Sequence, residues 1–152
     1  MNDLKPGIDY VGITTSFYCN DGKGNFLLHK RSKNCRDEQG NWDPGGGKLD
    51  HGIGIEETVL KEVQEEYGVK GKIQEQLPAH DIFRVQNRIK THWVCIPFFI
   101  LVNRNDVKNN EPHKIDQIDW FKLDNLPTPL HTGFAHTFEK YKSYFKKYMH
   151  NS

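Results

Sequence analysis

The chain has 152 residues, a length that fits one domain with a substantial buried core. Its 21 Lys and Arg residues nearly balance its 20 Asp and Glu residues, so the overall charge gives no strong case for nucleic acid or for a membrane surface as partner. No run of about 18 apolar residues and no basic segment followed by an apolar core occurs, which predicts no membrane anchor. Three cysteines without CxxC spacing argue against a disulfide framework or structural zinc, and favour a reducing, cytoplasmic location.

The first predicted elements are strands. Tyr10 to Cys19 and Asn25 to Arg31 are rich in β-branched and aromatic residues, and NDGKG between them favours a hairpin turn. A polar stretch then leads into WDPGGGK, where Pro44 restricts the backbone and three glycines allow conformations closed to other residues. We expect either a loop with a function or a very long turn at this point.

Residues 55 to 67 have the periodicity of an amphipathic helix. Apolar side chains recur every four residues along the segment, and Glu56 and Glu57 occupy its first turn. Gly68 is placed to end the helix, because glycine readily adopts the left-handed conformation found after a last helical turn.

Three carboxylates gather on one side of this predicted helix. Glu62, Glu65 and Glu66 fall within one arc of about 100°, beside the apolar face. Like charges so close raise one another's pKa and contribute no stability unless a cation lies between them. The cluster therefore predicts a metal site, with the solvated edge of an amphipathic helix as the alternative.

The second half of the chain reads as strands followed by a helix. Strands are expected at Lys72 to Val85, Thr91 to Val102 and Ile115 to Phe121; the second is apolar on both faces, as in a central strand, and Pro97 could introduce a bulge there. A final helix should pack an aromatic stripe on the sheet: Phe134, Phe138, Tyr141, Phe145 and Tyr148. This order predicts a single α/β or α+β domain over residues 1–152, with a mixed sheet between helical layers.

The segment GGGKLDHGIGIEETVLKEVQEEYGV resembles the Nudix hydrolase signature, a glycine, five residues, Glu, seven residues, then Arg-Glu-aliphatic-x-Glu-Glu-x-Gly-aliphatic. With Gly47 as the first glycine, these residues are in register across positions 47–69: Glu62, Val63, Glu65, Glu66, Gly68 and Val69. The flanks LLHKRSKN, WDPGG and IDWFKLDNLP extend the likeness to nearly the whole chain. The resemblance implies a MutT-like α/β/α sandwich with a central mixed β-sheet.

The resemblance also implies an activity. Nudix enzymes of this kind are Mg²⁺- or Mn²⁺-dependent pyrophosphohydrolases that cleave a phosphoanhydride bond of a nucleoside diphosphate derivative by attack of a metal-bound water. Carried onto this chain, the metal ligands are the carbonyl of Gly47 and the carboxylates of Glu62, Glu65 and Glu66. Glu65 is the expected general base, with Glu111 and Asp116 on a later loop as alternatives. Nucleoside triphosphates, modified nucleotides and nucleotide sugars all stay open as substrates.

Two positions depart from the signature. Ile53 stands where the family has its first glutamate, and Lys61, also a candidate catalytic residue, stands where it has arginine. A lysine lacks the planar fork with which arginine holds a neighbouring carboxylate, so the rate and the number of metals stay open. The departures keep a catalytically weakened nucleotide-binding module as an alternative. Cys35 and Cys95 keep a second one, an isopentenyl diphosphate isomerase, which uses cysteine and glutamate on the same fold.

Several residues are candidates for contact with a nucleotide-type small molecule. Phosphate could be bound by basic residues near the glycine loop, of which Arg31 is best placed by resemblance: Lys30, Arg31, Lys33, Arg36 and Lys48. Trp42 and Phe83 could stack on a base, although ordinary packing explains them equally well. Trp93 lies in a strongly apolar strand and is expected in the core. The aromatic face of the last helix could extend into a homodimer interface.

Overall fold

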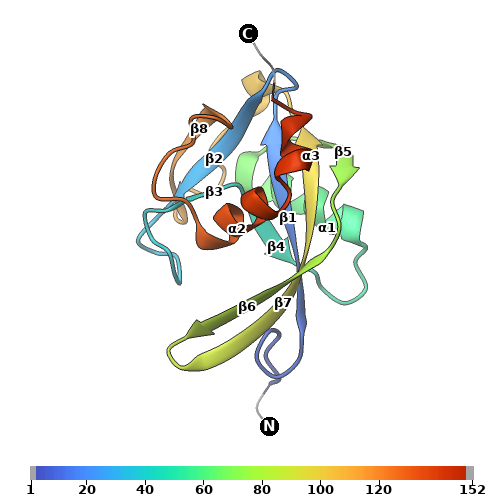
Figure 1. Cartoon of the computed structure of the whole chain (residues 1–152), viewed down its shortest axis with the longest axis vertical. Coiled ribbons are helices and arrows are strands. Elements are labelled where there is room, and N and C mark those ends of the chain that lie inside the picture. The colour runs from blue at the N-terminus through green and yellow to red at the C-terminus, as the bar shows by residue number, and fades with distance from the viewer. Residues whose placement is uncertain (1–2, 150–152) are drawn as a thin grey trace.

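The protein, seen here as a computed structural model describing residues 3–149, is built on one mixed sheet of eight strands. The strands are β1 (Gly12–Asn20), β2 (Asn25–Arg31), β3 (Trp42–Asp43), β4 (Gly46–Lys48), β5 (Lys72–Gln76), β6 (His80–Gln86), β7 (Ile89–Leu101) and β8 (Ile115–Lys122). The helix α1 (Ile55–Tyr67) covers one face, while α2 (Thr132–Lys140) and α3 (Lys142–Lys146) cover the other (Figure 1). A short 3₁₀ turn, η1, spans Arg104–Asp106. The predicted α/β/α sandwich is confirmed.

The centre of the sheet is the parallel pair β1 and β7. The two strands run side by side from Gly12 opposite Trp93 to Asn20 opposite Leu101. Because successive side chains of a strand point to opposite faces, Phe17 of β1 faces α1 and Tyr18 faces α2 and α3. This pair therefore supplies both halves of the core.

Each face of the sheet has its own apolar cluster. The α1 side is built from Phe17, Cys19, Leu27, Val59, Val63, Tyr67, Val69, Ile96, Phe98, Ile100 and Val102. The opposite side is mostly aromatic and is built from Tyr18, Phe26, Leu28, Trp42, Leu77, Phe99, Leu123, Phe134, Tyr141 and Phe145. Two covered faces explain why β7 is apolar on both of its sides.

The local signals of α1 and β2 predict their ends correctly. Helix α1 spans Ile55–Tyr67, as the periodicity indicates, and Gly68 ends it at φ 63°, where its N–H donates to the carbonyl of Gln64 at 2.9 Å. Strand β2 spans Asn25–Arg31, and the turn before it joins β1 to β2 as an antiparallel hairpin. No helix within residues 3–149 is long and apolar enough to cross a membrane.

Three expectations for the second half are wrong in detail. The strand expected at Lys72 to Val85 is interrupted at Pro78, which has no N–H for a ladder, and it forms β5 and β6. The single final helix is two, because the backbone leaves the helical region at Tyr141 (φ −110°, ψ 30°). The bulge that Pro97 could have introduced is absent, since its pairing with β1 is regular; a shift in register lies instead on β5 between Ile73 and Glu75.

Phe145 tests the aromatic side of the core. Its side chain is fully buried, with ring centroids of Tyr18, Phe138 and Phe99 at 4.8, 4.9 and 5.0 Å. We expect Phe145→Ala to lower the free energy of unfolding by about 3–5 kcal/mol, because a cavity replaces the ring. Phe83→Ala, at a residue that is 71% exposed, is the control and should change it by less than about 0.5 kcal/mol. Urea titration measures both, and equal losses would contradict the assignment of the core.

Candidate active site

The glycine loop, residues 44–47, leads into strand β4 and brings backbone directly against helix α1. Strand β4 pairs antiparallel with β1, which places Gly47 opposite Thr15. A Cβ at Gly47 would lie 2.3 Å from Cδ of Glu62, closer than atoms can approach. A side chain at position 47 would displace the Glu62 carboxylate, so the glycine leaves room for that carboxylate beside the loop.

Two of the predicted carboxylates lie behind this loop. Glu62 is half-buried beside Gly47, and the Oε2 atom of Glu66 is buried against Gly45. The Glu66 carboxylate accepts a hydrogen bond from the N–H of Gly46, but Oε2 has no partner in the described part of the chain. Burial without a partner is costly for a charged oxygen, so Oε2 is a natural position for a cation.

The third carboxylate turns outward. Glu65 is 47% exposed, and its Oε1 lies 3.8 Å from Nζ of Lys61, one helical turn earlier. The lysine thus replaces the family's arginine as a neighbour of Glu65, at a distance longer than a tight ion pair. The structure therefore separates the three predicted glutamates, with two behind the loop and one at the surface.

Glu111 joins the cluster from a distant part of the chain. The loop before β8 is bound to the end of α1, since the N–H of Asn110 donates to the carbonyl of Glu66 at 3.0 Å. The negative charge of Glu111 contributes to raising the pKa of both Glu62 and Glu66. Asp116, the other candidate base of this region, is exposed on β8, and it is not among the charges that shift the pKa of Glu62 or Glu66.

The carboxylates of the cluster repel one another and are partly or fully buried. Burial is the main cause that raises the pKa of Glu66, followed by the charges of Asp43, Glu111 and Glu62. The pKa of Glu62 is also raised, first by burial and then by Glu65 and Glu111; Lys61 opposes this. Asp50, in the turn before α1, adds a further negative charge beside Glu62. A divalent cation would relieve this repulsion.

The donor atoms suit a hard cation but are not yet arranged around one. No three His, Cys, Asp or Glu side chains between residues 3 and 149 stand close enough together to hold a metal. The Gly47 carbonyl, a predicted ligand, accepts hydrogen bonds from the hydroxyls of Thr14 and Thr15, both at 3.1 Å. Mg²⁺ prefers oxygen ligands, so these donor atoms fit the ion. To bind it, Glu65 would have to leave Lys61, and the Gly47 carbonyl would have to leave the two threonine hydroxyls.

A cleft of about 590 Å³ opens on the other side of β4. Gly46 and Lys48 line it, whereas Gly47 between them faces Glu62, as the alternation of a strand requires. Strand β4 is therefore the partition between the cleft and the carboxylates. Basic side chains on the cleft wall are Arg31, Arg36, Lys48 and Arg84.

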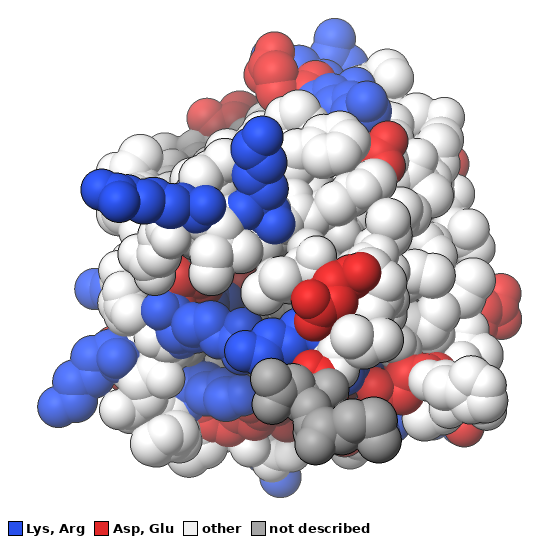
Figure 2. All heavy atoms as spheres, turned by 90° about the horizontal axis from the view of Figure 1, so that it is seen from below, with Lys and Arg blue, Asp and Glu red and all other residues white. Residues whose placement is uncertain are grey.

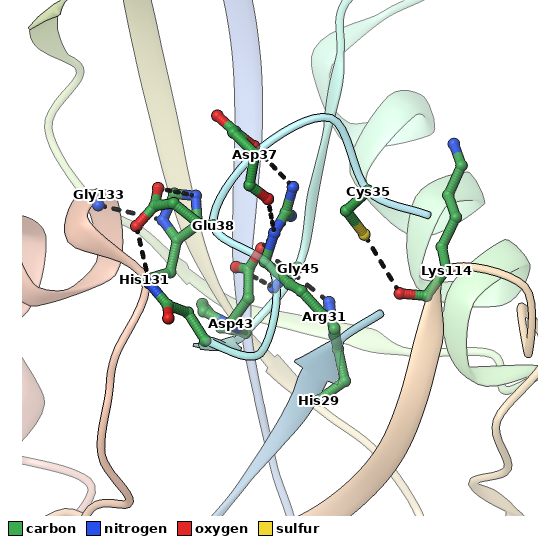
Figure 3. Close-up of polar contacts among 12 residues, drawn as sticks. His29, Arg31, Cys35, Asp37, Glu38, Asp43, Gly45, Lys114, His131 and Gly133 are labelled. Carbon is green, nitrogen blue, oxygen red and sulfur yellow. Dashed lines mark hydrogen bonds and ion pairs between the residues drawn. The ribbon is translucent and has the colours of Figure 1, made fainter. Parts of the chain in front are cut away.

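Arg31 is held inside the cleft by acidic neighbours. One of its terminal nitrogens lies 3.0 Å from Asp43, the other lies 2.8 Å from Asp37, and its Nε donates to the Asp37 carbonyl at 3.2 Å (Figure 3). A guanidinium has five N–H donors, so two stay available to a ligand. Arg36 and Lys48 are more exposed, and only Lys48 has an ion-pair partner among the described residues, Asp50 at 3.4 Å.

Glu38 ties three distant elements together at the rim of this cleft. It accepts a hydrogen bond from Nε2 of His131 at 2.9 Å (Figure 3). It also accepts one from the N–H of Thr132 at 2.7 Å, and it lies 3.4 Å from Arg84 of β6. Nδ1 of His131 accepts from the N–H of Gly133 at 3.0 Å, so the imidazole proton sits on Nε2. Glu38, Arg84 and His131 are not among the predicted site residues. The only signal in the sequence is the acidic pair before WDPGG.

The aromatic candidates are distributed differently from the prediction. Trp42 is 8% exposed and its ring packs on Phe121 in the core, so it does not face the cleft. Phe83 points out of β6 on the side away from the cleft, with its ring centroid 4.4 Å from that of His92. Trp93, expected in the core, instead lines the cleft and lies across Gly12 and Gly7. Gly7 and Gly12 have no side chains, which leaves room for the Trp93 ring beside them.

The cysteines do not form a pair in the cleft. Cys95 lines it, and its sulfur lies 3.3 Å from Oγ of Ser16. Cys35 sits in the loop after β2 and donates to the carbonyl of Lys114 at 3.3 Å (Figure 3). The end of the molecule seen in Figure 2 has Lys and Arg side chains gathered over part of it and Asp and Glu beside them. Such a mixed surface is unlike the basic face typical of nucleic-acid binding.

The family model of the NUDIX domain matches residues 12–141. The chain belongs to the Nudix family. Its fold is similar to a MutT NUDIX hydrolase from Burkholderia pseudomallei, at 27% identity and a TM-score of 0.74, covering 86% of this chain and 97% of that one. A MutT protein from Methanosarcina mazei Go1 is also 27% identical, with a TM-score of 0.71 and coverage of 90% and 96%. A NUDIX hydrolase from Nitrosomonas europaea, 18% identical over 88% of this chain and 89% of its own, shares the fold with a TM-score of 0.68.

The family places this Nudix domain among hydrolases of phosphorus-containing anhydrides, and divalent metals such as Mg²⁺ are general in it. Ile53, which replaces the first glutamate of the signature, is half-buried, and its N–H donates to the carbonyl of Asp50 at 3.3 Å. The position therefore offers no carboxylate, and Asp50 is the acidic residue nearest to it in the turn before α1.

The raised pKa of Glu66 predicts that the stability of the metal-free Nudix domain depends on pH. A carboxyl group whose pKa is raised by folding contributes stability below its ordinary pKa of about 4.3 and loses it as the pH rises through the raised value. Glu66→Gln should therefore raise the melting temperature of the metal-free protein near neutral pH, and the gain should vanish near pH 4. Scanning calorimetry with chelator tests this, and Glu57→Gln on the exposed side of α1 is the control. A variant no more stable than wild type at neutral pH would contradict the buried charge.

Proposed function

We propose that this Nudix domain is a Mg²⁺-dependent pyrophosphohydrolase that cleaves a phosphoanhydride bond of a nucleoside diphosphate derivative. The observation that carries the proposal is the partition at β4, with a cleft on one side and unbalanced carboxylates on the other. Nucleoside triphosphates, modified nucleotides and nucleotide sugars all have the polyphosphate that such a site would take.

The carboxylates would divide two tasks between them. The Gly47 carbonyl, Glu62 and Glu66, joined by Glu65 once it leaves Lys61, would hold Mg²⁺. The ion, when bound, would neutralise phosphate oxygens and lower the pKa of a coordinated water. Glu65 is our choice for the group that takes the proton from the attacking water, because it is the exposed member of the cluster. Glu111, whose charge already acts on Glu62, is the alternative.

The cleft would bind the rest of the substrate. Arg36 and Lys48 are exposed on its wall and would contact phosphate oxygens, while Arg31 would contribute its two remaining N–H donors. Trp93 offers a planar aromatic surface to a base in the same cleft. The predicted roles of Trp42 and Phe83 in stacking are not retained, because neither side chain lines the cleft.

Substitutions at Glu66 and Glu65 test whether these carboxylates are needed for hydrolysis. We expect Glu66→Gln and Glu65→Gln to lower kcat by at least about 10²-fold with circular dichroism unchanged, because the first removes a charged ligand of the cation and the second the proposed acceptor of the proton. Glu57→Gln is the matched control on the same helix and should keep full activity. The assay is phosphate or pyrophosphate release from nucleoside triphosphates, nucleotide sugars and dinucleotides, with Mg²⁺, with Mn²⁺ and with chelator. Normal turnover by Glu66→Gln would exclude the metal assignment.

Trp93 tests the orientation of the substrate. Stacking of a base on an aromatic ring contributes about 1–3 kcal/mol, so Trp93→Ala should raise KM by roughly 10-fold or more and leave kcat nearly unchanged. Trp93→Phe keeps a ring and should keep most of the affinity. Trp120→Phe, outside the cleft, is the control for loss of a tryptophan. An unchanged KM in Trp93→Ala would place the base elsewhere.

A second candidate is a nucleotide-binding module with little or no hydrolysis. It is favoured by Ile53, by the weak hold of Lys61 on Glu65, and by the threonine hydroxyls bonded to the Gly47 carbonyl. A nucleotide that raises the melting temperature but is not hydrolysed with any of several divalent metals would support it. A cytoplasmic location and a homodimer through the aromatic helices are also proposals, for cell fractionation and sedimentation to test.

A further inference from the structure

Tyr67 carries a hydroxyl group into the core beside the proposed metal site. It is the last residue of α1, directly follows Glu66, and is fully buried. Its ring packs edge-on against Phe17, with 6.1 Å between the ring centroids. Phenylalanine would fill the same space, so packing explains the ring but not the oxygen.

The hydroxyl connects three elements of the fold. It donates to the carbonyl of Pro44 in the glycine loop at 2.8 Å, and Nδ1 of His29 on β2 lies 2.7 Å from the same oxygen. Tyr67 has a single O–H proton and the Pro44 carbonyl can only accept, so His29 must donate its Nδ1 proton to the Tyr67 oxygen. The bonds therefore run in one direction, from β2 through α1 to the loop.

The loop held in this way is the one that contacts the carboxylates. Pro44 precedes Gly45, against which Oε2 of Glu66 is buried, and Gly46, whose N–H donates to Glu66. Gly47 lies against Glu62 on the same stretch of backbone. A displacement of Pro44 from Tyr67 would change the positions of both carboxylates relative to the loop.

We propose that Tyr67, oriented by His29, is a positioning residue that locks the glycine loop onto α1 and so sets Glu62 and Glu66 for the divalent cation. The inference rests on the proposed function, because a positioning role needs a reaction to serve. Neither residue touches the substrate cleft, so the effect reaches the site through the backbone of the loop.

The same fold contains a matched control for Tyr67→Phe. Tyr141, which is 8% exposed, also donates its hydroxyl to a proline carbonyl, that of Pro78, at 3.0 Å. Tyr141 belongs to the opposite apolar cluster, on the far side of the sheet from the carboxylates. Tyr67→Phe and Tyr141→Phe therefore remove the same kind of bond, one next to the proposed site and one far from it.

The first measurement is metal affinity. Tyr67→Phe should raise the Mg²⁺ concentration for half-maximal activity, and the Kd for Mn²⁺ alone by calorimetry, about 10–100-fold, as loss of a supporting bond behind metal ligands does. KM for the nucleotide should stay unchanged, and Tyr141→Phe should match wild type in all three. His29→Leu should shift the metal constants in the same direction, and the double variant should be less than additive. Equal metal constants in both phenylalanine variants would overturn the proposal.

The second measurement does not depend on activity. Exchange of the Gly46 amide hydrogen, which is bonded to Glu66, should be faster in metal-free Tyr67→Phe than in wild type or Tyr141→Phe. Unchanged exchange together with unchanged Mn²⁺ binding would reject the positioning role and leave the hydrolase proposal intact. If wild type hydrolyses no substrate, the proposed function fails, while exchange and Mn²⁺ binding still decide the positioning role of Tyr67.

Discussion

The contact between the glycine loop and helix α1 is the constraint on which the site depends. Gly45 and Gly47 have no side chains, so backbone lies directly against the carboxylates of Glu66 and Glu62. Gly45 has a positive φ of 120° and lies against the Phe17 ring, so a side chain there would be strained, and a side chain at Gly47 would displace Glu62. The Oε2 atom of Glu66 is buried behind this backbone with no hydrogen-bond partner among residues 3–149. The arrangement therefore costs stability in the absence of a cation, as functional sites often do. The hydrogen bond from Tyr67 to the loop, supported by the bond from His29 to the Tyr67 hydroxyl, opposes that repulsion.

The sheet determines which groups can meet at this contact. Strand β4 continues the sheet beside β1, so its residues alternate between the cleft and the helix. Lys48 and Gly46 thus face the cleft while Gly47 faces Glu62, with no change in the path of the chain. A cleft for a ligand and a cluster for a metal can share one short strand because the strand's two faces point in opposite directions.

Local patterns predict the parts of this structure that depend on local forces. The bounds of α1 follow from its periodicity and from Gly68, both visible within a few residues of sequence. The break at Tyr141 does not, because aromatic spacing continues through it and the tertiary packing decides where the helix ends. Pro78 is a local signal for a break, and the prediction of one continuous strand from 72 to 85 does not take it into account.

Residues of the site that come together from distant segments are the hardest to predict. Glu38 meets His131 and Thr132 across more than 90 residues, and no spacing rule connects them. Trp93 is apolar in sequence context and would suit the core, yet its pairing opposite Gly12 leaves it on the wall of the cleft. Glu111 could be proposed only through resemblance, since its approach to α1 depends on how the loop before β8 folds back.

Lys61 determines how firmly the cluster holds Glu65 before a metal binds. The pair is about half exposed at 3.8 Å, and surface pairs of this kind contribute only about 0–1 kcal/mol. An arginine could hold the carboxylate through two parallel hydrogen bonds and fix its direction. The lysine therefore makes Glu65 easy to release toward a cation but leaves it poorly oriented beforehand. The orientation of the metal-binding cluster must then come from the loop side of the site. There Tyr67 and His29 make hydrogen bonds that are buried and therefore not weakened by water.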